Sequence, residues 1–166
     1  MNIILAGMPG CGKTTIARTL GGLLDLNVID TDAEIVKKYG AINDIFENYG
    51  EQAFRNLETE VVKAVCLQSG VIVSTGGGCL LRQENVKLFK ESGKIIYLRT
   101  QLQTLLNRVE GDTSRPLLKG GAKEKMSRLL KERTPVYESA ADFIVDTDNL
   151  TPEQISENIA NLIKTL

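Results

Sequence analysis

The sequence predicts an α/β fold in which one parallel sheet is covered by helices. Short apolar runs alternate with helical periodicity from one end of the chain to the other, and this alternation is typical of strand–helix–strand units. The apolar runs are nearly continuous, as in strands that are buried on both faces. A glycine-rich turn, "GMPGCGKTT" at residues 7–15, joins the first run to the first helical stretch.

Five stretches are predicted to be strands, because each is short, apolar and bounded by polar residues or glycine. They are Asn2–Ala6, Asn27–Asp30, Val71–Thr75, Lys94–Leu98 and Phe143–Asp146. The intervals between them carry apolar residues at helical spacing, so each interval is expected to hold at least one helix.

Two helices have clear boundaries in the sequence. The longest is expected from about residue 51 to residue 68, and Gly70 ends it. The last helix begins at "TPEQ", where Thr151 is the expected N-cap, Pro152 lies in the first turn and Gln154 completes a capping box.

Composition excludes several classes of protein. With 166 residues, 42% hydrophobic and 25% charged, the chain is expected to form one soluble domain. A net charge of -1 does not favour nucleic acid, and no apolar run approaches the ~20 residues of a membrane span. The N-terminus lacks the features of a signal peptide, so a cytoplasmic protein is expected. The three cysteines form no C-x-x-C pair and histidine is absent, which argues against a zinc site or disulfides.

The glycine-rich turn fits the phosphate-loop spacing G-x-x-x-x-G-K-[ST], with Gly7, Gly12, Lys13 and Thr14 at its fixed positions. Such a loop points consecutive N–H groups at an anion, and the dipole of the following helix adds to their field. We therefore expect a bound nucleoside triphosphate, with the lysine on its β/γ-phosphates and the threonine hydroxyl on Mg²⁺. Cys11 lies in this loop and is expected to be the most reactive thiol.

Two carboxylates follow the second strand in "DTD", Asp30 and Asp32. If this segment is extended, they face the same side at the carboxyl edge of the sheet, where ligands bind in open α/β sheets. One could then serve Mg²⁺ while the other reaches a substrate hydroxyl. The alternative is that the first carboxylate only caps the next helix.

Three consecutive glycines, Gly76 to Gly78, follow the third strand. Glycines weaken regular structure, so a run of them predicts a backbone that closely approaches a ligand. A hinge or a simple turn is the alternative.

Two arginines are candidate anion-binding groups. Arg55 lies three residues before Glu58, so the two can pair on one helix face, although an exposed surface pair has the same spacing. Arg133 precedes Pro135, where we expect a proline-interrupted turn, and a basic residue near a helix end often only complements the helix dipole. The segment at about residues 110–125 breaks the alternation of strands and helices, and a loop of that length is usually functional.

In this order and at these intervals, "GMPGCGKT", "DTD", "GEQAFRNLE", "TGGG", "SRPLL" and "ERTPVY" resemble the motifs of shikimate kinases of the short, monofunctional type. The resemblance covers essentially the whole chain. It implies ATP-dependent phosphorylation of the 3-hydroxyl of shikimate, in chorismate and aromatic amino-acid biosynthesis. It also implies a monomer with a three-layer α/β/α P-loop kinase fold and sheet order 2-3-1-4-5.

The resemblance implies roles for individual residues. The residues implied to bind ATP are Gly10, Cys11, Gly12, Lys13, Thr14, Thr15, Arg108, Arg115 and Pro152, and those implied to serve Mg²⁺ are Thr14 and, in its outer shell, Asp30. The residues implied to bind shikimate are Asp32, Arg55, Gly76, Gly77, Gly78 and Arg133. Lys13, Asp32 and Arg115 are the implied catalytic residues, in a single domain with a substrate-binding region at about 31–61 and a mobile lid at about 110–125.

Two positions depart from the family pattern. Asn56 replaces the second arginine of the "FRRLE" type of motif, and Leu150 stands where some members carry a basic residue. The clamp arginine before Asn56 is unaffected. The second departure concerns the loop that the resemblance places beside the adenine.

Other functions of P-loop proteins fit the sequence less well. A gluconate-type or nucleoside-monophosphate kinase would share the fold, but the two arginines and the triple glycine argue against both. A GTPase-like switch ordinarily carries an N-K-x-D motif, which the sequence lacks. A non-catalytic ATP-binding regulatory module would be expected to have lost Lys13, Asp32 or an arginine, and all are present.

Arg115→Ala is expected to leave thermal stability nearly unchanged, because surface-loop substitutions usually alter the free energy of unfolding by at most about 0.5 kcal/mol. The kcat should fall steeply, since an arginine that reaches the transferring phosphoryl group stabilises the transition state most. A melting curve and steady-state kinetics on one preparation check both statements. A much lower melting temperature, or an unchanged kcat, would show that Arg115 has a structural role and does not act on the phosphoryl group.

Overall fold

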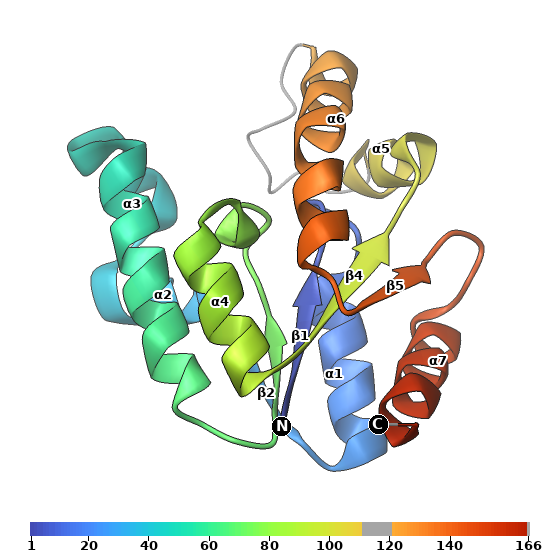
Figure 1. The fold of residues 1–166 in the computed structure, drawn as a ribbon. Helices are drawn as coiled ribbons and strands as arrows, with labels where there is room; N and C mark the ends of the chain where they lie inside the picture. The colour runs from blue at the N-terminus through green and yellow to red at the C-terminus, as the bar shows by residue number, and fades with distance from the viewer. Residues whose placement is uncertain (111–120, 166) are drawn as a thin grey trace.

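The computed structural model describes residues 1–110 and 121–165, which form a five-stranded parallel sheet with helices on both faces (Figure 1). The strands are β1 (Asn2–Ala6), β2 (Asn27–Asp30), β3 (Val71–Ser74), β4 (Gly93–Arg99) and β5 (Phe143–Asp146). All four pairings are parallel, in the order β2-β3-β1-β4-β5. The predicted fold class and sheet order are confirmed.

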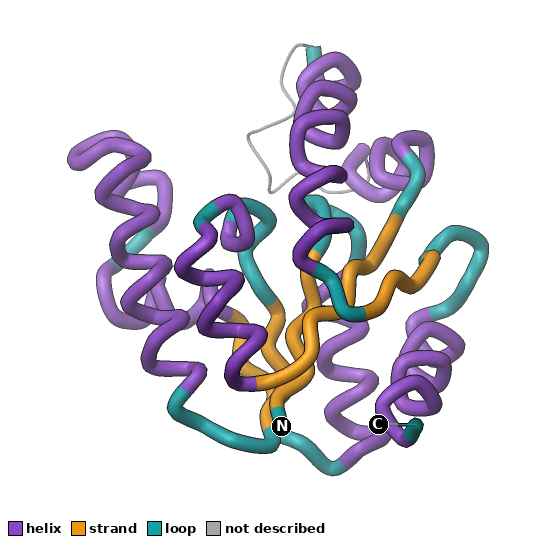
Figure 2. Tube along the Cα trace, viewed as in Figure 1, coloured by secondary structure: helices purple, strands orange, loops and turns teal. Residues whose placement is uncertain are grey.

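The helices in the described part of the chain fill the intervals between strands, as the periodicity predicts. They are α1 (Lys13–Leu24), α2 (Thr31–Tyr39), α3 (Ile42–Cys66), the short 3₁₀ helix η1 (Cys79–Leu81), α4 (Gln83–Ser92), α5 (Leu102–Glu110), α6 (Ala122–Ala140) and α7 (Pro152–Lys164). Helices α1 and α7 pack against each other, and α3 packs against α4. Figure 2 shows the strands between these two groups of helices.

Burial differs between the central and the edge strands. All five residues of β1 are buried, as expected for a strand covered on both faces. The prediction that every strand is buried on both faces is wrong for β2 and β5, which lie at the sheet edges and have partly exposed residues. Ile144 on β5 is 42% exposed. An apolar sequence alone does not distinguish an edge strand from a central one.

Helix α3 begins nine residues earlier than the sequence indicated. Its backbone contains one non-helical residue, Gly50, at φ 83°, where two helical segments join at a kink. The expected helix corresponds to the second segment. The first segment is held by tertiary packing, with the Phe46 ring 4.7 Å from the Phe54 ring.

The capping box of α7 is confirmed. The Gln154 N–H donates to Thr151 Oγ1 at 3.3 Å, and the Thr151 N–H donates to Gln154 Oε1 at 2.9 Å. Pro152 occupies the first turn, where its missing N–H costs no helical hydrogen bond. In the part of the chain that the structure describes, no helix has the length and apolarity needed to cross a membrane.

The fold brings distant segments of sequence to one edge of the sheet. The strands are parallel, so the segments after β1, β2 and β3 all leave the sheet at its carboxyl edge. These segments are the phosphate loop, the "DTD" segment and the three glycines. Helices α3 and α6 carry Arg55 and Arg133 to the same region.

Two adjacent glycines in α1 provide a test of the packing. A Cβ on Gly21 would lie 2.6 Å from Val28 Cγ2 and 3.0 Å from the Leu26 carbonyl oxygen, whereas a Cβ on Gly22 would meet no atom within 4 Å. We expect Gly21→Ala to lower the free energy of unfolding by about 1–3 kcal/mol through overpacking. Gly22→Ala should raise it by up to about 1 kcal/mol, because alanine has the higher helix propensity. Urea denaturation of both variants checks this, and shifts of the same sign would contradict the packing described here.

Candidate active site

The phosphate loop is shaped by glycines in conformations that other residues rarely adopt. Gly7, Gly10 and Gly12 have φ values of 150°, 82° and 97°. Gly12 is the N-cap of α1, and no side chain caps this helix end. The first N–H groups of α1 are therefore available to an anion, supported by the helix dipole. The exposed Thr15 lies in this first turn.

Lys13 is buried inside the loop, with only 9% of its surface exposed. Its ammonium group donates to the carbonyl oxygens of Gly7 and Met8, both at 2.9 Å, and lies 3.7 Å from the Cys11 sulfur. These contacts hold the positive charge where the loop would surround a phosphate chain.

The expectation that Cys11 is the most reactive thiol is not supported by its burial, because solvent does not reach its sulfur. Cys11 is 0% exposed, and its sulfur lies 3.7 Å from the Lys13 ammonium and 2.9 Å from the position of a Cβ on Gly7. Cys66 is only half-buried, although burial raises the pKa of its thiol. The Cys11 sulfur is therefore not accessible to a reagent in this conformation.

Arg108 reaches the phosphate loop from α5. Its guanidinium donates to the Cys11 carbonyl oxygen at 3.0 Å and lies 3.8 Å from the position of a Cβ on Gly12. Pro152, the other expected adenine contact, begins α7 after β5. The remaining predicted nucleotide residue, Arg115, lies outside the described residues.

Asp30 has two functions, one with each carboxylate oxygen. Its Oδ1 caps α2, accepting from the N–H groups of Asp32 and Ala33 at 3.1 and 3.2 Å. Its Oδ2 accepts from Thr14 Oγ1 at 2.8 Å and from Ser74 Oγ at 3.0 Å. The alternative that Asp30 only caps the next helix is therefore wrong, because Asp30 caps α2 and also contacts Thr14 and Ser74. The second oxygen and two hydroxyl groups form an all-oxygen cluster beside the phosphate loop, and oxygen ligands suit Mg²⁺.

Asp32 reaches the site by a different route from the predicted one. The residues after Asp30 do not continue as an extended segment, because α2 begins at Thr31. Asp32 lies in the first turn of this helix, and its Oδ1 lies 2.5 Å from where a Cβ on Gly76 would be. The Thr31 hydroxyl accepts from the Gly76 N–H at 2.9 Å, which ties the start of α2 to the glycine run.

The three glycines are explained by close approach of side chains. None of them has a positive φ. A Cβ on Gly76 would collide with Asp32, and one on Gly78 would collide with the Arg55 guanidinium. A Cβ on Gly77 would lie 2.9 Å from the Pro9 ring and 3.2 Å from a nitrogen of Arg133. The glycine run thus leaves room for the phosphate loop and for all three predicted substrate-binding side chains. A simple turn or hinge would not require this arrangement.

Arg55 and Glu58 form a buried pair, so the alternative of an exposed surface pair is wrong. The arginine and glutamate side chains are 13% and 1% exposed, and their N–H···O contact is 2.9 Å. The exposed Glu51 lies 3.5 Å from the same guanidinium. The two carboxylates leave the arginine oriented toward the glycine run.

Arg133 lies within α6, and the prediction of a turn after it is wrong. Pro135 is inside the same helix. A proline removes one helical N–H, which favours a break, but buried residues on both sides of it, Met126 and Tyr137, hold α6 against the body of the protein. Tertiary packing therefore outweighs the local preference.

Asn56 and Leu150, the two residues that depart from the family pattern, each contact other parts of the protein. Asn56 Oδ1 accepts from the Arg82 guanidinium at 2.9 Å, so it occupies a surface hydrogen bond outside the clamp. Leu150 packs against the hydrophobic core. Ser74 and Tyr137 also lie against the site. Tyr137 ends the "ERTPVY" motif and Ser74 directly precedes "TGGG", but the sequence pattern predicted a role for neither.

Glu58 is a buried acid near the glycines. Burial raises the pKa of its carboxyl, the Arg55 guanidinium opposes this rise, and the Asp32 carboxylate adds to it. Among the residues that the structure describes, its Oε1 has no hydrogen-bond partner and lies 3.1 Å from the position of a Cβ on Gly76. One carboxylate oxygen thus orients the arginine, and the other faces the glycines beside Asp32.

The raised pKa gives a pH dependence of known sign. Between the ordinary value of 4.5 and the higher folded-state pKa, the unfolded chain binds fewer protons than the folded chain, so stability falls as pH rises. We expect the stability of the unsubstituted protein relative to Glu58→Gln to fall as pH is raised through this window. Urea titrations over a pH series measure the difference, with Glu51→Gln as the control for the exposed partner of Arg55. A difference that rises with pH would contradict the assignment.

The comparisons with known proteins agree with one another. The shikimate kinase family model matches residues 9–164. The shikimate kinase of Caldicellulosiruptor bescii is 45% identical over 163 residues, which cover 97% of this chain and 94% of that protein. A structure of the Acinetobacter baumannii shikimate kinase in complex with shikimate has a TM-score of 0.92 at 36% identity, covering 99% of this chain and 93% of the other. The Aquifex aeolicus shikimate kinase has a TM-score of 0.86 at 32% identity, covering 99% and 96%. The chain belongs to the shikimate kinase family.

Proposed function

We propose that this protein transfers the γ-phosphoryl group of ATP to the 3-hydroxyl of shikimate, giving shikimate 3-phosphate and ADP. The observation that supports this best is the convergence of Asp32, Arg55 and Arg133 on three glycines beside a phosphate loop. This arrangement offers one carboxylate for a hydroxyl and two guanidinium groups for an anion, next to a site for a triphosphate. Shikimate has both of the required groups, since it is a carboxylic acid with ring hydroxyls.

The nucleotide side of the site is built from the loop and its neighbours. The N–H groups of residues 10–15 and the Lys13 ammonium would hold the phosphates, with Arg108 and Pro152 toward the adenine. The Thr14 hydroxyl and Asp30 would hold Mg²⁺, because they already meet at 2.8 Å as oxygen ligands. When bound, Mg²⁺ would neutralise phosphate charge.

On the substrate side, Arg55 and Arg133 would bind the shikimate carboxylate. Guanidinium groups match planar oxyanions, and charge-assisted hydrogen bonds are stronger than neutral ones. The backbone of Gly76–Gly78 would line the pocket between them. Asp32 would accept a hydrogen bond from the reacting hydroxyl and so orient its oxygen toward the γ-phosphorus.

The chemistry requires positioning more than covalent participation by the protein. An O–P bond forms to the shikimate hydroxyl oxygen as the bond from the γ-phosphorus to the ADP oxygen breaks, with the two oxygens in line. Lys13 would stabilise charge on the transferring group from within the loop. Asp32 and the arginine clamp fix the acceptor at the distance and angle that this displacement needs.

Other parts of the proposal extend the sequence predictions. We assign residues 31–61, which carry Asp32 and Arg55, to the substrate-binding region of a single catalytic domain. The predicted lid at about 110–125 includes residues 111–120, which lie outside the described residues, so it and the role of Arg115 stay predictions. A cytoplasmic monomer that binds neither nucleic acid nor membranes also stays a prediction.

The substrate assignment is tested by ADP release with and without shikimate, at fixed ATP and Mg²⁺. Shikimate should stimulate ADP release, whereas gluconate and nucleoside monophosphates should not. A faster rate with either of these acceptors would overturn the assignment. Release that is independent of every acceptor would indicate an ATPase.

The clamp is tested on the same preparations by calorimetry. Arg55→Ala and Arg133→Ala should each weaken shikimate binding by roughly 10- to 100-fold, the scale of a charge-assisted hydrogen bond of about 1.5–3 kcal/mol. ATP affinity should not change. Arg128→Ala is the control, because it removes an exposed arginine from the same helix as Arg133. Unchanged shikimate affinity in both clamp variants would show that the two arginines do not bind the substrate carboxylate.

A further inference from the structure

We infer that Tyr137 is a positioning residue, which fixes α6 on the glycine run so that Arg133 is held ready for the shikimate carboxylate. The inference rests on the proposed function, because it assigns the tyrosine a role through the clamp. It concerns a residue that contacts the pocket backbone and does not itself bind substrate.

Tyr137 connects two parts of the site that are distant in sequence. It lies one helical turn after Arg133, so the two side chains share a face of α6. Its hydroxyl donates to the carbonyl oxygen of Gly77. A Cβ on that same glycine would lie 3.2 Å from a nitrogen of Arg133. One residue of the glycine run is therefore in contact with both the tyrosine and the arginine.

The tyrosine is buried and firmly packed. It is 1% exposed, and its ring lies 5.1 Å from the ring of Tyr97 on β4, near the centre of the sheet. Burial raises the pKa of its phenol, and the adjacent Arg133 guanidinium opposes that rise. The hydroxyl accordingly remains a hydrogen-bond donor throughout the physiological pH range.

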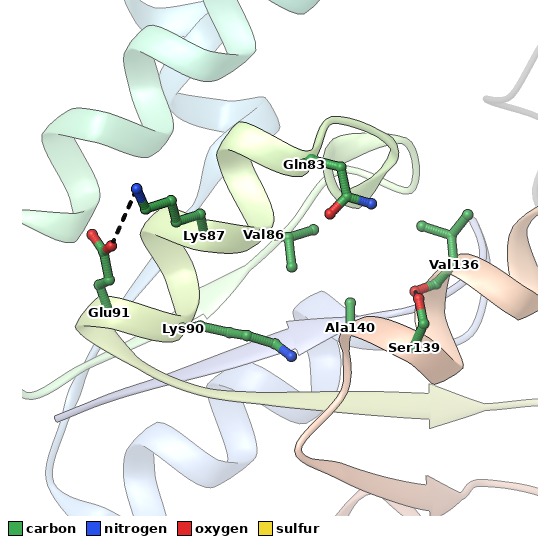
Figure 3. A pocket seen from close by; sticks show the side chains of 8 residues that line it. All are labelled: Gln83, Val86, Lys87, Lys90, Glu91, Val136, Ser139 and Ala140. Carbon is green, nitrogen blue, oxygen red and sulfur yellow. Dashed lines mark hydrogen bonds and ion pairs between the residues drawn. The ribbon is translucent and has the colours of Figure 1, made fainter.

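The Tyr137 hydrogen bond adds a polar contact to the apolar packing that holds α6 against the body of the protein. Pro135 supplies no backbone N–H, so α6 lacks the hydrogen bond that residue 135 would donate to the carbonyl oxygen of Lys131. On its α4 side, α6 borders a groove of about 410 Å³ (Figure 3). Val136, Ser139 and Ala140 of α6 face this groove opposite Gln83, Val86 and Lys90 of α4. Beside this groove, the hydrogen bond from Tyr137 to the Gly77 carbonyl oxygen ties α6 to the glycine run.

Tyr137→Phe tests this role because it removes the hydroxyl and keeps the ring that packs on Tyr97. The Kd for shikimate should rise about 3- to 10-fold, the scale of one neutral hydrogen bond. The Kd for ATP should not change. Ser139→Ala is the matched control, because it removes an exposed hydroxyl from the groove side of the same helix.

A double-variant cycle separates positioning from general destabilisation. If Tyr137 acts through Arg133, Tyr137→Phe should change the shikimate Kd less than about 2-fold in an Arg133→Ala background, and keep its full effect in an Arg55→Ala background. Equal effects in both backgrounds, or no effect in the unsubstituted protein, would overturn the inference. Unchanged affinity in Arg133→Ala alone would overturn the clamp and this role with it. Hydrogen exchange at residues 77–79 gives a readout without substrate, and Tyr137→Phe should accelerate it while Ser139→Ala should not.

Discussion

The site depends on how closely the backbone of Gly76–Gly78 approaches three charged side chains. Asp32, Arg55 and Arg133 come from three different helices. Asp32 and Arg55 occupy the space that a Cβ would need on Gly76 and Gly78, and a Cβ on Gly77 would meet Pro9 with Arg133 beside it. Any other residue at Gly76 or Gly78 would displace a charged group, and at Gly77 it would displace the Pro9 ring of the phosphate loop. The glycines therefore allow the Asp32 carboxylate and the two guanidinium groups to lie close together beside that loop.

This close approach also determines the electrostatics of the pocket. Glu58 is buried beside Arg55, and its pKa is raised mainly by that burial, with a smaller contribution from the nearby Asp32 carboxylate. The arrangement costs stability, because a buried acid with an unpartnered oxygen is less favourable than a solvated one. In return, Arg55 is held in one orientation before substrate arrives, which reduces the ordering that binding would otherwise require.

The sequence predicted most of the fold because local and tertiary preferences agree there. Three strands match their predicted bounds, and the capping box at Thr151 is present in the structure. The failures occur where packing overrides local signals. Pro135 lies inside a helix that buried residues hold together, and β2 and β5 are apolar strands with exposed residues. The start of α3 could not be predicted because Gly50 joins two helical segments in a conformation that a helical pattern does not reveal.

The site was only partly predictable, for a related reason. Motif spacing identified Asp30 and Asp32 but described them wrongly, as neighbours on an extended segment. Because α2 begins between them, their carboxylates serve different partners: one oxygen of Asp30 remains with Thr14 and Ser74, while Asp32 turns to the glycines. The start of α2 thus directs the two acids of the "DTD" motif to different parts of the site, one to the phosphate loop and the other to the glycine run. The contacts of Ser74 and Tyr137 could not be predicted from the sequence, although Tyr137 ends the "ERTPVY" motif, because they are made only after β3 and α6 have packed into place. The motifs indicated which charged residues to expect, whereas the contacts that orient those residues depend on the tertiary structure.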